Sequence, residues 1–308
     1  MAAGSKKVII AALIGNSLIA VTKFIASSMT GSSAMFSEGI HSLVDTGNQG
    51  LLLYGLKASQ KPADKYFPFG HGKEIYFWSF VVSILIFALG SGISIYEGVH
   101  HILHPEEISS PMINYIVLGL AIIFEGAALY IAFKEFNKTR GNRSYLGAVK
   151  DGKDPSLFVV LFEDSAAMLG LFVALIGITL AQVTGDAWWD GVASVSIGVI
   201  LGLTAVWLAI ETKGLLIGEA ASQETVESIR KIVTVKDEIN GVNEILTLHM
   251  GPEFILVNIS LNFRNDITTD TLAELIDNLV KEIKGKHPFV KRVFVEAEAL
   301  KELGDHHD

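Results

Sequence analysis

The chain has 308 residues, of which 50% are hydrophobic, and its formal net charge is −9. Its positive mean hydropathy of +0.44 and its long uncharged runs are typical of transmembrane helices and exclude an ordinary soluble enzyme. The acidic balance argues against a nucleic-acid partner, and the absence of cysteine excludes disulfides and thiolate metal sites. Any metal must therefore be held by nitrogen and oxygen ligands, with a thioether as the alternative sulfur donor.

Six apolar segments meet or exceed the ~20 residues that cross a bilayer, which predicts an all-α six-helix transmembrane bundle over residues 1–212. They cover residues 8–28, 34–56, 75–102, 112–134, 156–182 and 188–211. Lys and Arg gather at the N-terminus and after the second and fourth segments, whereas the other three connections have none. By the positive-inside rule, both termini face the cytoplasm. In the sixth segment, Gly198 and Gly202 form a Gly-x-x-x-Gly pattern that favours close helix contact.

The sequence changes character from residue 213, where a small polar domain begins. Amphipathic periodicity predicts helices over 222–239 and 268–285, and β-rich runs predict strands over 245–250, 254–263 and 290–295. The order α-β-β-α-β predicts a cytoplasmic α+β domain, ferredoxin-like or metallochaperone-like, over 213–300. So small a core gains stability from a second copy, so we expect a homodimer through this domain. Residues 301–308 are predicted to be a disordered tail.

The second segment carries ionisable residues that a membrane helix rarely contains. Glu38, His41, Asp45 and Asn48 follow one another at intervals of three, four and three, so they form one polar stripe. An ionisable side chain in hydrocarbon costs ~2.5–3.5 kcal/mol and persists where it faces a bundle interior, an ion or a water path. Helix–helix hydrogen bonding is the alternative explanation. Two carboxylates and an imidazole favour a divalent cation site, since these ligands suit zinc, iron, cobalt and manganese.

Further acids lie in the fourth and fifth segments. Glu163 and Asp164 are adjacent and project about 100° apart, so they do not face one ion with equal ease. Asp164 shares a helix face with Met168. We expect neither acid to pair with a cationic side chain, on the expectation that no neighbouring span holds a Lys or Arg. Glu125 is interpreted as a proton carrier or accessory ligand, with a helix–helix hydrogen bond as an equal alternative.

Several motifs together resemble those of the cation diffusion facilitator family. They are Gly31-Ser32-Ser33-Ala34, His41-Ser42-Leu43-Val44-Asp45, Pro62-Ala63-Asp64 and Pro68-Phe69-Gly70-His71-Gly72-Lys73-Glu74. Residues 66–78 and 163–166 are most similar to the zinc-transporter-nine-like branch of that family. The resemblance implies a homodimeric exporter that exchanges a divalent cation, with zinc as the leading cargo, for protons by alternating access.

The resemblance also implies a transport site with two ligands from the second span and two from the fifth. The first pair corresponds to His41 and Asp45. The second corresponds to Asp164 and Met168, where Met168 replaces the usual carboxylate. Glu163, Glu38, Asn48 or a water would then complete the coordination shell.

The resemblance implies three further features outside the bundle. Asp64 and His71 match a loop metal site, although Phe67 stands where some members have histidine. Lys73 is expected to pair with Glu219 as a charge lock. The metal positions of the C-terminal domain correspond to Asn243, Ser260, Glu296 and Glu298, so we expect no strong binuclear zinc site there.

Three alternatives remain open at this point. Manganese, iron or cobalt could be the cargo. The altered fifth-span site is also compatible with a non-transporting metal-sensing scaffold. An intramembrane metal hydrolase is disfavoured, because the sequence has no His-Glu-x-x-His signature. We therefore expect no enzyme activity, no cofactor beyond the transported ion, and a multi-pass location in a bacterial inner membrane.

Overall fold

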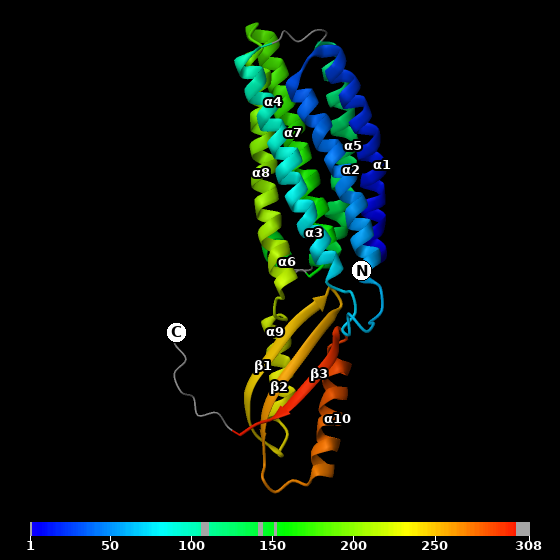
Figure 1. Cartoon of the computed structure of the whole chain (residues 1–308), viewed down its shortest axis with the longest axis vertical. Coiled ribbons are helices and arrows are strands. Elements are labelled where there is room, and N and C mark those ends of the chain that lie inside the picture. The colour runs from blue at the N-terminus through cyan, green and yellow to red at the C-terminus, as the bar shows by residue number, and fades with distance from the viewer. Residues whose placement is uncertain (1, 106–110, 141–143, 151–152, 300–308) are drawn as a thin grey trace. The chain divides into compact units, whose positions relative to one another are not determined.

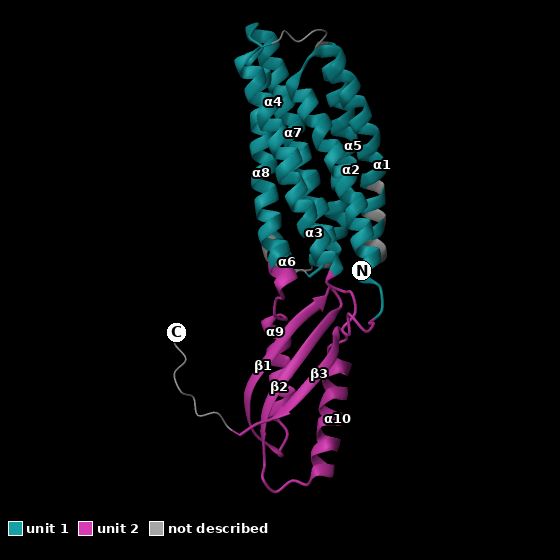
Figure 2. Ribbon diagram, viewed as in Figure 1, with its two compact units in different colours: residues 1–62, 74–213 teal, residues 63–73, 214–308 magenta. Residues whose placement is uncertain are grey.

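The computed structural model describes all residues except 1, 106–110, 141–143, 151–152 and 300–308. The chain divides into two compact units, shown in Figure 2: residues 1–62 with 74–213, and residues 63–73 with 214–308. The loop 63–73, which the sequence-based division assigned to the first domain, groups with the second unit. The predicted tail over 301–308 lies outside the described residues.

The first unit is a bundle of long helices that run side by side (Figure 1). Their bounds are α1 Ala2–Thr30, α2 Ser33–Ser59, α3 Glu74–Leu85, a π-helical segment η1 Ile86–Ser91, α4 Gly92–Leu103, α5 Pro111–Arg140, α6 Tyr145–Lys150, α7 Pro155–Thr184 and α8 Trp188–Ile217. Among the described residues, five helices are long and apolar enough to cross a membrane: 12–30, 74–103, 112–138, 155–184 and 188–217. The chain is thus a mostly helical, multi-pass membrane protein.

The remaining long helix, α2, is the second of the six predicted spans. Its 27 residues are enough to cross a bilayer, but its polar stripe makes it less apolar than the other five. It packs against α1, α3, α4 and α7. Because the stripe is buried while Leu43 and Tyr54 are exposed, α2 turns its polar face inward and its apolar side chains outward. This arrangement is expected of a helix that lines an ion path.

Local sequence explains where these helices begin and end. Gly31 adopts a positive φ of 71° in the turn between α1 and α2, a conformation that costs glycine little. The hydroxyl of Ser32 caps α2, and the carboxylate of Asp154 caps α7, with Pro155 in the first turn. Gly185, with φ of 73°, ends α7 in the left-handed conformation.

Glycines bring α4 and α8 into close contact. A Cβ at Gly98 would overlap the backbone of α8, and one at Gly198 would overlap Ile95. A Cβ at Gly202 would lie 2.8 Å from the Ser91 hydroxyl. The close approach predicted from Gly198 and Gly202 is therefore present, against the third span. The π-helical segment in that span was not predicted, because hydrophobic periodicity does not distinguish one wide turn from an α-helical turn.

The second unit is a three-stranded sheet with helices on one face. Its elements are α9 Gln223–Thr234, β1 Ile239–Gly251, β2 Phe254–Phe263, α10 Thr269–Lys286 and β3 Val290–Ala297. The strand order is β1-β2-β3, with β1 and β2 antiparallel and β2 and β3 parallel, so α10 is the crossover helix. Residues of α9 and α10, such as Ile229 and Leu279, pack with Val257 and Ile259 of β2 in one buried core. The predicted α-β-β-α-β order is confirmed.

The boundary between α9 and β1 differs from the prediction. The helix expected to reach residue 239 ends at Thr234, and the strand begins at Ile239 rather than at residue 245. Register shifts between Ile239 and Gly241 and between Val242 and Glu244 interrupt the pairing with β2. Such irregularities break the period of two from which a strand is recognised, so this part of β1 is hidden in the sequence.

Candidate ion-binding site in the helix bundle

The polar stripe of α2 is buried along its length. The side chains of Glu38, His41, Asp45 and Asn48 are each at most 1% exposed. His41 Nε2 lies 3.2 Å from Asp45 Oδ2, as the spacing of four residues on one helix face allows. The structure therefore brings the imidazole and the carboxylate of the predicted second-span pair together.

Helix α7 meets this stripe through Glu163. The Asn48 side-chain amide donates a hydrogen bond of 2.7 Å to Glu163 Oε1. The carboxyl groups of Asp45 and Glu163 also lie within hydrogen-bonding reach of each other, so one proton between them would join them. Glu163, rather than Asp164, is thus the α7 acid in direct contact with α2.

Two more buried acids surround this contact. Both carboxylate oxygens of Asp164 and of Glu125 lack a hydrogen-bond partner within the described part of the chain, and both side chains are almost fully buried. Each is an electrostatic neighbour of Asp45. The Met168 methyl group lies 3.5 Å from where a Cβ at Gly126 would be, so Met168 is directed towards α5. The thioether and the carboxylate of the fifth-span pair thus do not meet the α2 stripe as directly as Glu163 does.

The chemistry of these donors suits a divalent cation, although the groups are not preassembled around one. No three His, Asp or Glu side chains of the described residues are arranged to hold a metal ion as they stand. His41 Nδ1, both Asp45 oxygens and Glu163 Oε2 are nevertheless buried without hydrogen-bond partners. Unsatisfied buried carboxylate oxygens of this kind are costly unless a proton or a cation satisfies them. An incoming cation would replace the contact between His41 and Asp45.

Lys23 of α1 also belongs to this polar region, and it was not among the predicted site residues. Its ammonium donates hydrogen bonds of 2.9 Å to Glu38 Oε2 and 2.9 Å to Ser42 Oγ. The side chains of Lys23 and Glu38 are both 0% exposed. The expectation that the spans next to Glu163 and Asp164 hold no Lys or Arg is wrong, because Lys23 lies in α1, although its partner is Glu38. The signal was available, since a lysine in the middle of an apolar span is as unusual as an acid.

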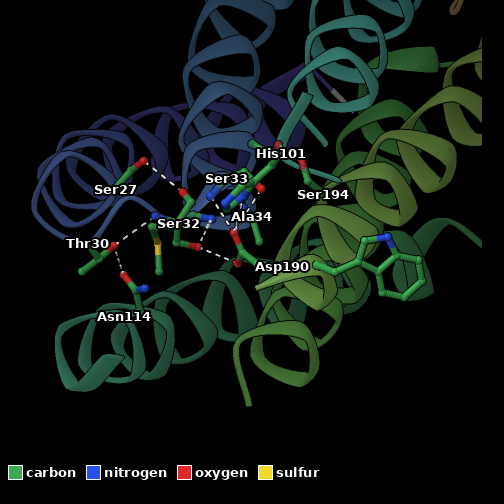
Figure 3. Close-up of polar contacts among 12 residues, drawn as sticks. Ser27, Thr30, Ser32, Ser33, Ala34, His101, Asn114, Asp190 and Ser194 are labelled. Carbon is green, nitrogen blue, oxygen red and sulfur yellow. Dashed lines mark hydrogen bonds and ion pairs between the residues drawn. The ribbon is translucent and has the colours of Figure 1, made fainter. Parts of the chain in front are cut away.

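A second polar cluster lies at the start of α2, where Asp190 of α8 meets the helix end (Figure 3). One carboxylate oxygen accepts from Ser32 Oγ at 2.8 Å, and the other accepts from the backbone N–H of Ser33 at 2.6 Å and of Ala34 at 3.2 Å. His101 Nδ1 of α4 lies 3.2 Å from the same oxygen as these N–H groups. A carboxylate at a helix N-terminus is stabilised by the unpaired N–H groups and the helix dipole. Asp190 thereby joins α2, α4 and α8.

Hydroxyl and amide groups extend this cluster to neighbouring helices (Figure 3). Ser194 Oγ donates to the carbonyl of Ser94 at 2.9 Å and also contacts the Ser37 hydroxyl. Thr30 Oγ1 donates to Asn114 Oδ1 at 2.9 Å. These contacts use neutral groups, as hydrogen bonds between membrane helices commonly do. The polar stripe of α2 also contains ionisable groups, which such helix–helix contacts do not require.

The predicted loop site is a pair of side chains in the second unit. His71 Nε2 lies 3.0 Å from Asp64 Oδ2. The pKa of Asp64 is held below its ordinary value, chiefly by the hydrogen bond with His71 and then by the backbone N–H groups of Phe67 and Tyr66. This network accounts for the loop conformation without a metal ion, and whether it also binds one stays a prediction.

Lys73 reaches the last residues of α8, which belong to the second unit. Its ammonium donates to the carbonyls of Leu216 at 3.4 Å and Ile217 at 3.3 Å. Glu219 follows these carbonyls closely in sequence, and its own carbonyl accepts from the backbone N–H of His249 at 2.9 Å. The Lys73–Glu219 charge lock stays a prediction.

The sheet positions that correspond to family metal ligands hydrogen-bond to one another. Asn243 Nδ2 donates to Ser260 Oγ at 3.0 Å, and Ser260 Oγ in turn donates to Glu298 Oε2. The Glu296 side chain is exposed on β3. An amide and a hydroxyl are weak ligands for zinc, so this donor set suits a structural role.

Comparison with known proteins identifies the bundle. Residues 9–217 match the cation efflux transmembrane domain. The chain is 30% identical to the human protein named proton-coupled zinc antiporter SLC30A9, mitochondrial, over 95% of this chain and 58% of that protein, so it spans about three fifths of that relative. It is 25% identical to metal tolerance protein C4 of Arabidopsis thaliana, over 95% and 73% of the two chains. It is 24% identical to the manganese efflux system protein MneP of Bacillus subtilis, over 94% and 95%. The matched domain covers more than half of the chain, which therefore belongs to the cation efflux family.

Proposed function

We propose that the protein exports a divalent metal cation across a membrane in exchange for protons, with zinc as the cargo. The observation that carries the proposal is that His41 and Asp45 of α2 are in contact and buried beside Glu163 of α7, which is hydrogen-bonded to the same face of α2. Imidazole and carboxylate are the ligands that zinc takes in the absence of cysteine. The names of the relatives, a zinc antiporter and metal tolerance and efflux proteins, support the same activity.

Proton exchange follows from the charge of the site. Metal binding requires ionised carboxylates and a neutral imidazole. When the metal leaves, the buried acids are left uncompensated, and isolated charges in a low-dielectric interior are costly. Protons therefore replace the cation, and the scarcity of an empty, fully ionised site couples the two flows. Alternating access by rocking of the helix bundle exposes the site to each side in turn.

Each acid has a distinct role in this proposal. His41, Asp45 and Glu163 bind the ion, and Asn48 orients the Glu163 carboxylate. Asp164 and Glu125 have unpartnered buried oxygens within the described residues, which suits proton carriers beside the ion. Met168, directed towards α5, is not a ligand in this scheme. No further cofactor is required.

Manganese is the second candidate cargo. Among the described residues around the α2 stripe, the buried carboxyl groups are those of Glu38, Asp45, Glu125, Glu163 and Asp164, whereas His41 supplies the one imidazole. Hard oxygen ligands favour manganese over zinc, and one relative is named as a manganese efflux protein. The family membership and the relatives named as transporters favour transport over a metal-sensing scaffold or a hydrolase.

A homodimer through the second unit is part of the proposal. The sheet face opposite the helices carries Leu246 of β1 and Phe294 of β3, which are 53% and 48% exposed. Both pair with Asn258 of β2, so they lie in one row across the sheet. Leu248 and Leu256 form the adjacent row on the same face. An exposed apolar sheet face suits association with a second copy of the chain.

Orientation and location complete the proposal. The distribution of Lys and Arg supports cytoplasmic termini. A bacterial inner membrane stays a prediction, because the human relative is named as mitochondrial. Cysteine labelling at each terminus with an impermeant reagent in whole cells would test the orientation.

Metal flux into proteoliposomes with an imposed pH gradient tests the transport proposal. We expect the wild type to take up zinc with coupled proton release, and Asp45→Asn and Glu163→Gln to lose this flux. Glu135→Gln is the matched control, because Glu135 is a partly exposed acid of α5 paired with Lys138. Flux that survives Asp45→Asn would overturn the proposal. Manganese flux that exceeds zinc flux in the same vesicles would assign the second cargo.

A further inference from the structure

A buried ion pair lies beside the proposed ion site and is not part of it. Lys23 of α1 and Glu38 of α2 are in contact at 2.9 Å, and neither side chain is exposed. The Lys23 ammonium also bonds Ser42, which directly follows His41 in the chain. Glu38 and Asp45 are seven residues apart, or ~10 Å along the helix. Both charges of the pair therefore act on a cation bound at His41 and Asp45.

Stability alone gives a weak reason for such a pair. The cost of removing two charges from solvent offsets most of their mutual attraction, and apolar side chains of similar size often stabilise a protein equally well. Only one oxygen of the Glu38 carboxylate accepts a hydrogen bond from Lys23, because its Oε1 has no hydrogen-bond partner in the described structure. That oxygen lies against Gly170 of α7, where a Cβ would overlap it. The pair thus reaches across α1, α2 and α7, the helices around the ion site.

The effect of the pair on a cation follows from Coulomb's law. The Lys23 charge repels a divalent cation at the site, and the Glu38 charge attracts it. In the intact pair these effects largely cancel. A single unbalanced charge about 10 Å from a divalent ion, at an effective dielectric constant of about 20, changes the binding constant by about a hundredfold or more. Lys23 and Glu38 also act electrostatically on His41 and Glu125, respectively.

We propose that Lys23 and Glu38 form a charge-balanced pair that sets the affinity of the α2–α7 site for its divalent cation. The balance keeps the ion held weakly enough to be released. This role rests on the proposed transport function and adds two affinity-determining residues that are not ligands. We therefore predict that removing the Lys23 charge raises the affinity and that removing the Glu38 charge lowers it.

The test uses isosteric neutral variants in proteoliposomes at one alkaline pH. Lys23→Met leaves the Glu38 charge unbalanced, so we expect the KM for zinc to fall by about tenfold or more and the maximal rate to fall with slower release. Glu38→Gln leaves the Lys23 charge unbalanced, so we expect the KM to rise by about tenfold or more. In the double variant these opposite shifts cancel and the KM returns towards that of the wild type. Lys138→Met, which breaks an exposed Lys–Glu pair, is the control and should change neither parameter.

A purely structural pair predicts a different result. Both single variants would then lose folded protein or maximal rate without opposite shifts of the KM, and that result overturns the proposal. If Lys23→Met does not fold, Glu38→Gln decides alone: a raised KM with a wild-type maximal rate supports the role, and an unchanged or lowered KM rejects it. A wild type without metal flux would instead contradict the transport function, so the two failures are distinguishable.

Discussion

Asp190 of α8 accepts a hydrogen bond of 2.6 Å from the backbone N–H of Ser33, the first residue of the helix that carries the proposed ion site. With the bond from Ala34, this contact satisfies two of the N–H groups that a helix leaves free at its start. It also fixes α2 against a neighbouring helix at one end, eight residues before His41. The depth and rotation of the polar stripe in the bundle therefore depend on a residue outside it.

Replacing Asp190 by alanine should destabilise the protein. The substitution removes the acceptor of two buried N–H groups and two serine hydroxyls, so we expect a loss of about 2–4 kcal/mol. Thermal unfolding in detergent micelles, followed by circular dichroism, measures the change. Asp186→Asn is the control, because Asp186 is exposed, and its asparagine variant keeps the acceptor for the Trp188 N–H. Equal melting temperatures for Asp190→Ala and the wild type would contradict this account.

Gly170→Ala should impair transport although it adds only a methyl group. The new Cβ would overlap Glu38 Oε1 and force the buried carboxylate to move. We expect a loss of stability of about 1–3 kcal/mol, and a change in zinc KM if Glu38 shifts relative to Lys23. Gly119→Ala is the matched control, because nothing lies within 4 Å of its added Cβ. Wild-type stability and KM in Gly170→Ala would show that the space beside Glu38 is not tightly packed.

Acidification should release the loop 64–71. Asp64 has a pKa lowered from its ordinary value of 3.8, first by the hydrogen bond with His71. A carboxylate with a depressed pKa stabilises the folded loop at pH values above its ordinary pKa, and this contribution is lost as the pH falls through the lowered value. The amides of Tyr66 and Phe67, each 2.8 Å from Asp64 Oδ1, report the change. Their hydrogen-exchange protection should be full at neutral pH and should decline as the pH falls below the ordinary carboxyl pKa of 3.8.

The variant Asp64→Ala provides the reference for that measurement. It lacks the carboxylate, so the same two amides should be unprotected at every pH. Protection in the wild type that does not depend on pH between 2 and 7, roughly the range in which carboxylates titrate, would mean that backbone geometry alone holds the loop.

A charge on the open sheet face should dissociate the proposed dimer. Leu246→Glu or Phe294→Glu places a carboxylate in the exposed apolar row, and we expect the dimer dissociation constant to rise about tenfold or more. Sedimentation of the protein in detergent measures the oligomeric state. Val235→Glu is the control, because Val235 is 70% exposed at the end of α9 and away from this row. A Phe294→Glu protein that remains dimeric would place the interface elsewhere.

Sequence patterns predicted the bundle well because the bilayer imposes a strong constraint. Long apolar runs and buried acids are both conspicuous, so six spans and the stripe around His41 were predicted from composition and spacing. Five of the six are helices that the described structure shows to be long and apolar enough to cross a membrane, and the sixth is α2. The start of β1 was not predicted, because the register shifts next to Gly241 remove the alternation of a regular strand.

The partners of the site residues were harder to predict than the residues themselves. Helical spacing shows which side chains share a face of one helix, but it gives no pairing between helices. The choice of Glu163 over Asp164 as the contact of α2 depends on the rotation of α7, and the capping of Ser33 by Asp190 joins residues 157 positions apart. Lys23 was visible in the sequence, whereas its partner Glu38 became evident only from the packing of α1 on α2.

The polar face of α2 also bears on how the protein is made. Taken alone, this helix is a poor substrate for lateral release from a translocon into lipid. The turn at Gly31 allows α1 and α2 to leave together as a hairpin, with the Lys23 charge neutralised by Glu38 before either meets hydrocarbon. In a glycosylation-mapping assay, a segment carrying α2 by itself should insert poorly, and one carrying both helices should insert efficiently. Membrane insertion of the bundle would then depend on Lys23 and Glu38, the same two side chains that we propose to set its affinity for the ion.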